Sequence, residues 1–344
     1  MLAMPVTVRS FAKINLGLHI GGLRPDGFHE LRTVYQTIAL HDVIRVRVGR
    51  GDGIEIRCED PRVPTDSTNT CYRIVERAMA ALGVKGRVVI EIDKKLPVQG
   101  GLGGASGNAV ATLLAFERAA KKTLSGAERL HIAADVGSDL PLFLIGGTVL
   151  GIGHGEDVYP LSDLPTTACV VATPEIGVST PKAFADWDLL QSSAGVPPAT
   201  QTGRGEGLRR GASTAKLTPP SPSDRMNEFS RTVSAWLSGI SGVPGSRSRG
   251  RAETLLLDLV RTGIENDFER VVFPQYPELR EVKRVLEREG AFYVSLSGSG
   301  SAIYGLFRAR TAAIKAAARL KASGVPAVAT STLTRRQYWS RIFD

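Results

Sequence analysis

Leu96-Pro97-Val98-Gln99-Gly100-Gly101-Leu102-Gly103-Gly104-Ala105-Ser106-Gly107-Asn108 contains five glycines in thirteen residues. Because glycine has no Cβ, such a stretch can approach a ligand closely and turn its backbone amides toward it. Apolar residues follow at helical spacing, so we expect a helix over residues 103–117. The positive end of that helix would point at the loop. A polyphosphate is the ligand that this arrangement favours.

Two well-known phosphate-binding patterns are absent from this loop. No Lys-Ser or Lys-Thr pair follows the glycines, so the loop is not a Walker A motif, and it lacks the GxGxxG spacing of dinucleotide-binding proteins. Taken alone, the glycines fit equally well a structural turn between a strand and a helix. The rest of the chain has to decide between the two interpretations.

Strand-like and helical segments are mixed along the whole chain. Strands are predicted for residues 6–10, 42–48, 53–58, 87–93, 168–174, 291–298, 301–307 and 327–333, and helices for 69–81, 103–117, 277–289 and 311–323. At 344 residues the chain exceeds the usual size of one domain. We therefore expect an α+β protein of two domains, residues 1–160 and 161–344.

The net charge of +9 is concentrated in one segment. Residues 192–251 hold nine Lys or Arg and three acidic residues, a net charge of +6, and are rich in Ser, Gly and Pro. Such a composition buries too little apolar surface to offset chain entropy, so we expect a mobile insertion, with a short amphipathic helix between Met226 and Ile240. The insertion is either a loop without function or a basic tether for an acidic partner. It lacks interleaved aromatic residues, which argues against nucleic-acid binding.

Other classes of protein are disfavoured by simple features. Residues 1–10 do not resemble a signal peptide, and no stretch approaches the roughly 18 apolar residues of a membrane helix, so we expect a cytoplasmic protein without membrane contact. Cys58, Cys71 and Cys169 are odd in number and widely spaced, which favours small buried residues over a disulfide framework or a zinc site. We expect a monomer or a weak homodimer.

Three ordered motifs resemble those of the GHMP kinases, the superfamily of galactokinase, homoserine kinase and mevalonate kinase. The glycine loop from Pro97 resembles the second motif, residues 11–18 (FAKINLGL) the first, and residues 296–302 (LSGSGSA) the third, which in the family lies against the phosphate loop. The resemblance implies an N-terminal ATP-binding domain, a C-terminal α/β domain on the substrate side, and an active site in the cleft between them. It assigns ATP binding to Asn69, Pro97, Gly100, Gly101, Leu102, Gly103, Gly104, Ala105, Ser106, Gly107 and Asn108.

Further segments are similar to the GHMP kinases that act on a cytidine-diphosphate-linked methylerythritol. They are residues 24–31 (RPDGFHEL), 137–141 (GSDLP) and 266–269 (NDFE). The resemblance implies that Phe28 and His29 grip cytosine, by stacking and by hydrogen bonds, and that Phe184 forms the second wall. Phe28 and Phe184 also fit plain core positions. Many relatives carry Tyr at the position of Phe28, so a contact from that hydroxyl is lost here.

Asp139 is the first candidate for the chemistry. It lies between a Gly-Ser turn and an apolar stretch, and a partly buried carboxylate requires compensation or a purpose. The resemblance makes Asp139 the base for the acceptor hydroxyl and Lys13, which interrupts an apolar strand, its cationic partner. Asn15, Ser297 and Gly298 are expected at the acceptor. A helix cap or a surface ion pair would also explain Asp139, and Asn69 is equally suited as a helix N-cap.

The expected reaction is transfer of the γ-phosphoryl group of ATP to the 2-hydroxyl of the methylerythritol unit, with Mg²⁺ bridging the β- and γ-phosphates. Relatives usually have GLGGGSSNAA, whereas this chain has Ala105 for a glycine and Gly107 for the second serine. Ala105 is unstrained only at negative φ, and Gly107 removes a hydroxyl, so nucleotide affinity is expected below the family norm. The alternatives are a homoserine- or mevalonate-type kinase and a catalytically silent regulator that uses the insertion as a docking arm.

Overall fold

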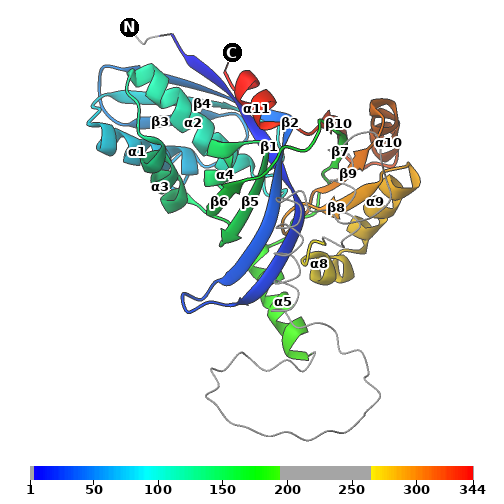
Figure 1. Cartoon of the computed structure of the whole chain (residues 1–344). Helices are drawn as coiled ribbons and strands as arrows, with labels where there is room; N and C mark the ends of the chain where they lie inside the picture. The colour runs from blue at the N-terminus through cyan, green and yellow to red at the C-terminus, as the bar shows by residue number, and fades with distance from the viewer. Residues whose placement is uncertain (1–3, 194–264, 344) are drawn as a thin grey trace, which may run out of the picture.

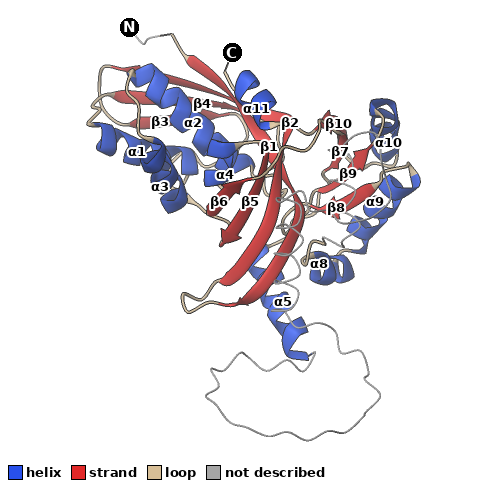
Figure 2. Cartoon of the chain, in the orientation of Figure 1, coloured by secondary structure: helices blue, strands red, loops and turns tan. Residues whose placement is uncertain are grey.

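The computed structural model describes residues 4–193 and 265–343. The predicted helix between Met226 and Ile240, and almost all of the basic insertion, lie outside the described residues. None of the described helices has both the length and the apolar character needed to cross a bilayer. The described chain contains two β-sheets, each covered by helices (Figures 1 and 2). This mixture confirms the predicted α+β class.

The first sheet has the strand order β3-β4-β2-β5-β6, and β1 also pairs with β2. Two strands in this sheet are unusually long: β1 and β2 form an antiparallel ribbon that projects beyond the other strands (Figure 1). The strands are β1 (Val6–Leu23), β2 (His29–Gly49), β3 (Ile54–Cys58), β4 (Arg87–Asp93), β5 (Thr148–Gly153) and β6 (Asp157–Pro160). The predicted strands match β3 and β4 closely, whereas β1 continues far beyond its expected end at Ser10. β2 begins at His29, where a strand was expected only from residue 42, and β5 and β6 were not predicted.

Helices cover one face of the first sheet. They are α1 (Thr70–Leu82), α2 (Gly104–Ala120), α3 (Gly126–Val136), α4 (Pro141–Ile145) and α11 (Arg335–Arg341). Apolar residues of the sheet such as Ile44 and Ile90 pack against Ile74 of α1 and Val110 of α2 in one fully buried cluster. The α2 helix, which follows the glycine loop, lies at the centre of this layer and is buried along most of its length.

The second sheet is antiparallel throughout, with the order β10-β7-β9-β8. Its strands are β7 (Ala168–Ala172), β8 (Tyr293–Leu296), β9 (Ile303–Phe307) and β10 (Ala327–Ser331), and the helices around it are α5 (Thr180–Ser193), α8 (Glu269–Gln275), α9 (Pro277–Arg288) and α10 (Arg310–Ala322). The chain passes from the first sheet to the second after Pro160, and α11 then returns to the first. The division at residue 160 therefore describes the sheets, and as a division into folding units it stays a prediction.

A third apolar cluster joins the two sheets. Ala12, Ile14 and Leu16 of β1 pack with residues of the second sheet such as Val171 and Tyr304. Successive side chains of a strand point to opposite faces, so Lys13 and Asn15, which alternate with these apolar residues, project the other way, toward α2 and its loop. Packing between the sheets thus fixes the direction of the two polar side chains.

Candidate active site

The three glycine- and lysine-containing motifs meet at one place. The backbone N–H of Lys13 donates to the carbonyl oxygen of Leu102 at 2.9 Å. From the third motif, the Ser297 hydroxyl donates to the Gly101 carbonyl at 2.9 Å, and the Ala302 N–H donates to Gly100 at 3.1 Å. The loop is therefore held between β1 on one side and the β8–β9 turn on the other.

Two glycines of the loop are required by this close packing. Gly101 has φ +73°, and a Cβ there would collide with the carbonyl oxygen of Ser297. Gly103 has φ +68°, and its Cβ would lie 2.9 Å from both Lys13 Cγ and Phe143 Cζ. Both the backbone conformation and the available space exclude a side chain at these positions.

A cavity of about 350 Å³ opens over the loop, a volume within the range of small-ligand sites. Of the residues predicted to bind the nucleotide, every one except Gly107 lines it. A Cβ on Gly107 would lie 3.0 Å from Ser10 Oγ and from the Phe11 carbonyl oxygen, so a hydroxyl there would meet β1. The expected loss of nucleotide affinity from Gly107 stays a prediction. Ala105 lies in the first turn of α2 without strain, because among the described residues other than glycine only Gln99 and Lys121 have positive φ.

Asn69 fits both roles considered for it. Its side-chain oxygen accepts from the Cys71 N–H at 2.8 Å and caps α1, while its amide donates to the Pro64 carbonyl at 2.6 Å. It also lines the cavity together with Arg62 and Val63. The cap thus holds one wall of the cavity in place.

Asp42 is a structural residue of the site that the sequence analysis did not identify. Its carboxylate on β2 is fully buried and accepts from the Lys94 ammonium at 2.6 Å, from the backbone N–H groups of Lys95 and Leu96 at 2.7 Å, and from the Asn108 amide at 3.0 Å. These donors flank the glycine loop at both ends. Asp42 therefore fixes where the loop leaves β4 and where α2 begins.

Lys13 and Asp139 are brought together as predicted from their motifs. The Lys13 ammonium lies 3.4 Å from a carboxylate oxygen of Asp139 and donates to Asn15 Oδ1 at 2.7 Å. The Lys13 side chain is 4% exposed and that of Asp139 is 35% exposed, so the carboxylate is the member of the pair that a substrate can reach. The Asn15 amide donates to the Thr33 hydroxyl at 2.7 Å, which fixes the Asn15 oxygen toward Lys13.

Tyr35 on β2 is a second residue that the sequence analysis missed. Its hydroxyl donates to the other Asp139 oxygen at 2.9 Å. Burial, reinforced by the negative charge of Asp139, holds the pKa of Tyr35 well above its ordinary value, so the phenol keeps its proton and remains a donor. Gly155 makes room for the ring, because a Cβ there would collide with the phenolic oxygen. Only the β1–β2 register, which places Tyr35 opposite Asn15, would have pointed to this residue.

The third motif reaches the same site. A Cβ on Gly298 would lie 3.5 Å from the Lys13 ammonium and 3.6 Å from Asn15 Oδ1. Ser297 is fully buried, and its hydroxyl is used by Gly101. Gly298, beside Lys13, is therefore the better placed of the two predicted acceptor contacts.

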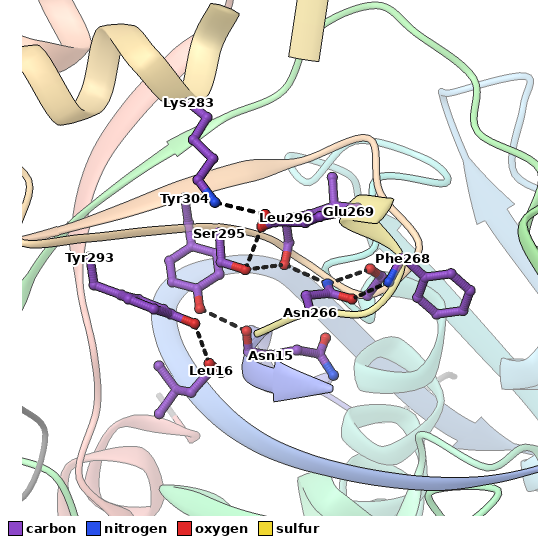
Figure 3. A network of polar contacts seen from close by, with 11 residues as sticks. Asn15, Leu16, Asn266, Phe268, Glu269, Lys283, Tyr293, Ser295, Leu296 and Tyr304 are labelled. Carbon is purple, nitrogen blue, oxygen red and sulfur yellow. Dashed lines mark hydrogen bonds and ion pairs between the residues drawn. The ribbon is translucent and has the colours of Figure 1, made fainter. Parts of the chain in front are cut away.

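A polar network supports this motif from the second sheet (Figure 3). The Asn266 amide donates to the carbonyl oxygens of Leu296 and Gly298, at 2.8 and 2.7 Å. Glu269 accepts from the Leu296 N–H at 2.9 Å and pairs with Lys283 at 2.7 Å.

Two tyrosine hydroxyls complete the network on the side of β1. Tyr304 donates to the Asn15 carbonyl at 2.7 Å, and Tyr293 donates to the Leu16 carbonyl at 2.6 Å.

The predicted aromatic pocket lies where β2 begins. Phe28 is 61% exposed, and its ring centroid is 4.7 Å from that of His154. His29 is buried and stacks on Phe184, with centroids 5.1 Å apart and planes 11° from parallel. One face of Phe184, expected to form a wall of the pocket, is thus covered by His29 in this structure. Each predicted wall thus contacts a histidine ring, Phe28 that of His154 and Phe184 that of His29, and a joint sandwich by the two phenylalanines stays a prediction.

Comparison with known proteins agrees with this geometry. The family models described as GHMP kinases N terminal domain and GHMP kinases C terminal match residues 69–147 and 251–325. A protein of Solibacter usitatus named 4-diphosphocytidyl-2-C-methyl-D-erythritol kinase is 36% identical over 309 residues, which cover 90% of this chain and 83% of the relative. A protein of the same name from Acaryochloris marina is 34% identical, covering 92% of this chain and 91% of the relative.

Two solved structures superpose on almost the whole of this chain. A crystal structure of 4-(cytidine 5'-diphospho)-2C-methyl-D-erythritol kinase superposes with a TM-score of 0.67 at 26% identity, over 95% of this chain and 98% of that one. A homoserine kinase from Cytophaga hutchinsonii superposes with a TM-score of 0.66 at 19% identity, over 96% of this chain and 95% of that one. The second likeness shows the fold alone.

Proposed function

The chain belongs to the 4-diphosphocytidyl-2-C-methyl-D-erythritol kinases of the GHMP family, and from this premise we propose the roles of its site residues in phosphorylating the 2-hydroxyl of that substrate. Its activity is the ATP-dependent phosphorylation of an alcohol in isoprenoid precursor synthesis. The observation that carries the assignment of roles is the meeting of Lys13 and Asp139, 3.4 Å apart, beside the glycine loop.

Asp139 is the base in this proposal. It is the partly exposed carboxylate of the pair, and it is fixed from two sides by the Tyr35 hydroxyl and the Lys13 ammonium. Lys13 orients Asp139 and offsets the negative charge that grows as the hydroxyl oxygen attacks phosphorus. As the new P–O bond forms and the bond to ADP breaks, the proton of the hydroxyl passes to Asp139.

The glycine loop holds the triphosphate of ATP. The cavity above it is lined by the backbone of residues 97–106, and α2 begins there with its unpaired amides. Among the described residues no three His, Cys, Asp or Glu side chains form a metal site, which fits Mg²⁺ that is bound mainly through phosphates and water. The Ser106 hydroxyl is the side chain of the loop suited to hold it, and the ion would neutralise charge on the phosphates.

The acceptor is held from the other side. Phe28 and His29 take the cytidine end of the substrate, and Asn15 and Gly298 lie next to Lys13 at the alcohol end. A cytoplasmic location and a monomeric or weakly dimeric state are also part of the proposal. Size-exclusion chromatography of the purified chain tests the second of these.

Release of ADP from Mg-ATP, measured with a panel of alcohols that includes the cytidyl substrate, homoserine and mevalonate, tests the proposal. Turnover of the cytidyl substrate, inhibited by CDP, is the expected result. Asp139→Asn should lower kcat about 10²- to 10⁴-fold while ATP binding is retained, because only the proton acceptor is lost.

Asp135→Asn is the matched control for this variant. Asp135 lies four residues away on α3, is 47% exposed, and lies 4.0 Å from Arg77 and 3.9 Å from His131, so the kcat of this variant should be unchanged. An Asp139→Asn enzyme with normal turnover would exclude Asp139 as the base, and turnover of homoserine or mevalonate in place of the cytidyl substrate would contradict the assigned acceptor.

A further inference from the structure

The imidazole ring of His29 is held in one orientation by two neighbours on α5. Its Nε2 lies 2.8 Å from a carboxylate oxygen of Asp188, and its plane lies flat on the ring of Phe184. The His29 side chain is only 8% exposed, whereas that of Asp188 is 53% exposed. A hydrogen bond in the ring plane and a stacking contact on its face together leave the ring little freedom to rotate.

This hydrogen bond determines which nitrogen carries the proton. In a neutral imidazole one ring nitrogen is a donor and the other an acceptor, and an ionised carboxylate is an acceptor only. Because Asp188 accepts, Nε2 must carry the proton, and Nδ1 is left with a lone pair. Within residues 4–193 and 265–343, no protein group forms a hydrogen bond with Nδ1. His29 therefore has an unused acceptor, and its neighbour in sequence is the exposed Phe28.

We infer that Asp188 is a positioning residue that determines pyrimidine specificity: it holds His29 as a hydrogen-bond acceptor for the exocyclic amino group of cytosine. Cytosine has an amino donor at C4, where uracil has a carbonyl acceptor. An acceptor at Nδ1 therefore binds cytosine and is left facing the oxygen of uracil. The inference rests on the proposed function, since it places the cytidine end of the substrate at Phe28 and His29.

Competition by CDP and by UDP, measured against the cytidyl substrate, tests this role. The wild-type enzyme should bind CDP more tightly than UDP. In Asp188→Ala the proton is free to occupy either nitrogen, so the fraction of His29 with an acceptor at Nδ1 falls to about one half and CDP should bind about twofold more weakly. UDP, which the other tautomer suits, should bind more tightly than in the wild type, so the ratio of the CDP and UDP affinities should fall. In Asp188→Asn the amide can donate to Nε2 and favour the opposite tautomer, so UDP should bind more tightly than in the wild type. The KM for ATP and the kcat at saturating substrate should not change.

Asp186→Asn is the matched control. It makes the same chemical change two residues away on α5, at a carboxylate that Lys182 and Gln275 bind at 2.7 and 2.8 Å, so the preference for CDP should be retained. The ¹⁵N chemical shifts of the His29 ring give a readout independent of activity: the wild type should have a protonated Nε2 and an unprotonated Nδ1, and Asp188→Ala should lose this pattern.

The outcomes separate this inference from the proposed function. A wild type that does not turn over the cytidyl substrate overturns both. A wild type that turns it over, combined with an Asp188→Ala variant that keeps the full preference for CDP, overturns the inference alone. Protonation of both His29 nitrogens in the active enzyme at neutral pH also overturns it, because Nδ1 would then be a donor.

Discussion

Gly103 is a loop residue that packs closely against the side chain of Lys13, the proposed partner of Asp139. Its φ of +68° and the nearness of Lys13 Cγ and Phe143 Cζ leave no room for a methyl group. The adjacent Gly104 differs in both respects: its φ is not in the left-handed region, and the nearest atom to an added Cβ is the flexible end of Lys94, at 3.4 Å. Two neighbouring glycines of one motif therefore have unequal roles.

Gly103→Ala should lower kcat about 100-fold, because a methyl group displaces Lys13 from Asp139, and a misplacement of about 1 Å costs that much. Gly104→Ala, in the first turn of α2, should be close to wild type. Steady-state kinetics with Mg-ATP and the cytidyl substrate compare the two. Equal losses in both variants would show that the displacement of Lys13 is not the cause.

The site residues that lie in recognisable sequence motifs could be predicted. Lys13, Asp139 and the loop were identified from short ordered stretches, and the structure places them together. Tyr35 and Asp42 were not identified, because their roles depend on strand register and on partners more than fifty residues away in the chain. A lone Tyr or Asp within a strand carries no local signal of such a partner.

Among the elements, β2 joins the sheet to the phosphate loop through Asp42. The carboxylate is fully buried, and its ammonium partner on Lys94 is 8% exposed. Removing one partner of a buried ion pair leaves an uncompensated charge. This lowers the free energy of unfolding far more than the loss of an exposed pair does. The neighbouring pair, Asp93 and Lys95, offers the contrast, since its atoms are 3.6 Å apart and its side chains are 42% and 56% exposed.

Asp42→Ala should lower the free energy of unfolding by about 3–5 kcal/mol and weaken ATP binding, because the loop loses its anchor at both ends. Asp93→Ala should change stability by less than about 1 kcal/mol. Urea denaturation and nucleotide titration measure both effects. Nucleotide affinity equal to wild type in a folded Asp42→Ala enzyme would argue against an anchoring role.

Element prediction failed where polar residues or short length hid the pattern. The continuation of β1 beyond Ser10 contains Lys13, Asn15 and three glycines, and register shifts interrupt its pairing, so simple alternation ends early. The helices α3 and α11 were not predicted, although each begins with a capping box, at Ser125 with Glu128 and at Thr334 with Gln337. These local signals were present in the sequence and would have located both helices.

At the scale of the whole molecule, buried tyrosines connect stability to pH. Burial raises the pKa values of Tyr35, Tyr293, Tyr304 and Tyr338 above their ordinary value. Unfolding returns each phenol to its ordinary pKa of about 10. Above that pH the unfolded chain has released protons that the folded protein still holds, so the free energy of unfolding falls as pH rises. Below about pH 10 the contribution of these groups is fully present.

Above about pH 10 the free energy of unfolding should fall with a slope that reaches about 1.4 kcal/mol per pH unit for each buried tyrosine. Denaturant unfolding between about pH 9 and pH 11 measures it. Tyr338→Phe should reduce this slope by the contribution of one buried tyrosine. Tyr159→Phe, which changes a residue that is 51% exposed, should leave the slope unchanged. A stability that does not vary over this range would show that the phenols are not protected by burial.

Two domains were expected because strand and helix patterns recur in both halves of the chain. The structure has two sheets, and the division into domains stays a prediction. The return of the chain to the first sheet was not predicted, because no local feature of residues 333–343 indicates their partners. In the structure the Arg9 N–H donates to the Ile342 carbonyl at 2.7 Å, and the Tyr338 hydroxyl donates to the Phe143 carbonyl at 2.7 Å. Figure 1 shows α11 beside β1.

The position of α11 matters for the order in which the protein matures on the ribosome. Tyr338 supports α4, the short helix that begins directly after Asp139 and Leu140. Residues 335–341 are synthesised after both sheets, so α4 has its packing partners α2, α3 and β6 before the support from Tyr338 is available. The hydrogen bond from Tyr338 to Phe143 is therefore added to the segment behind Asp139 last, after the strands and helices of both sheets have been synthesised.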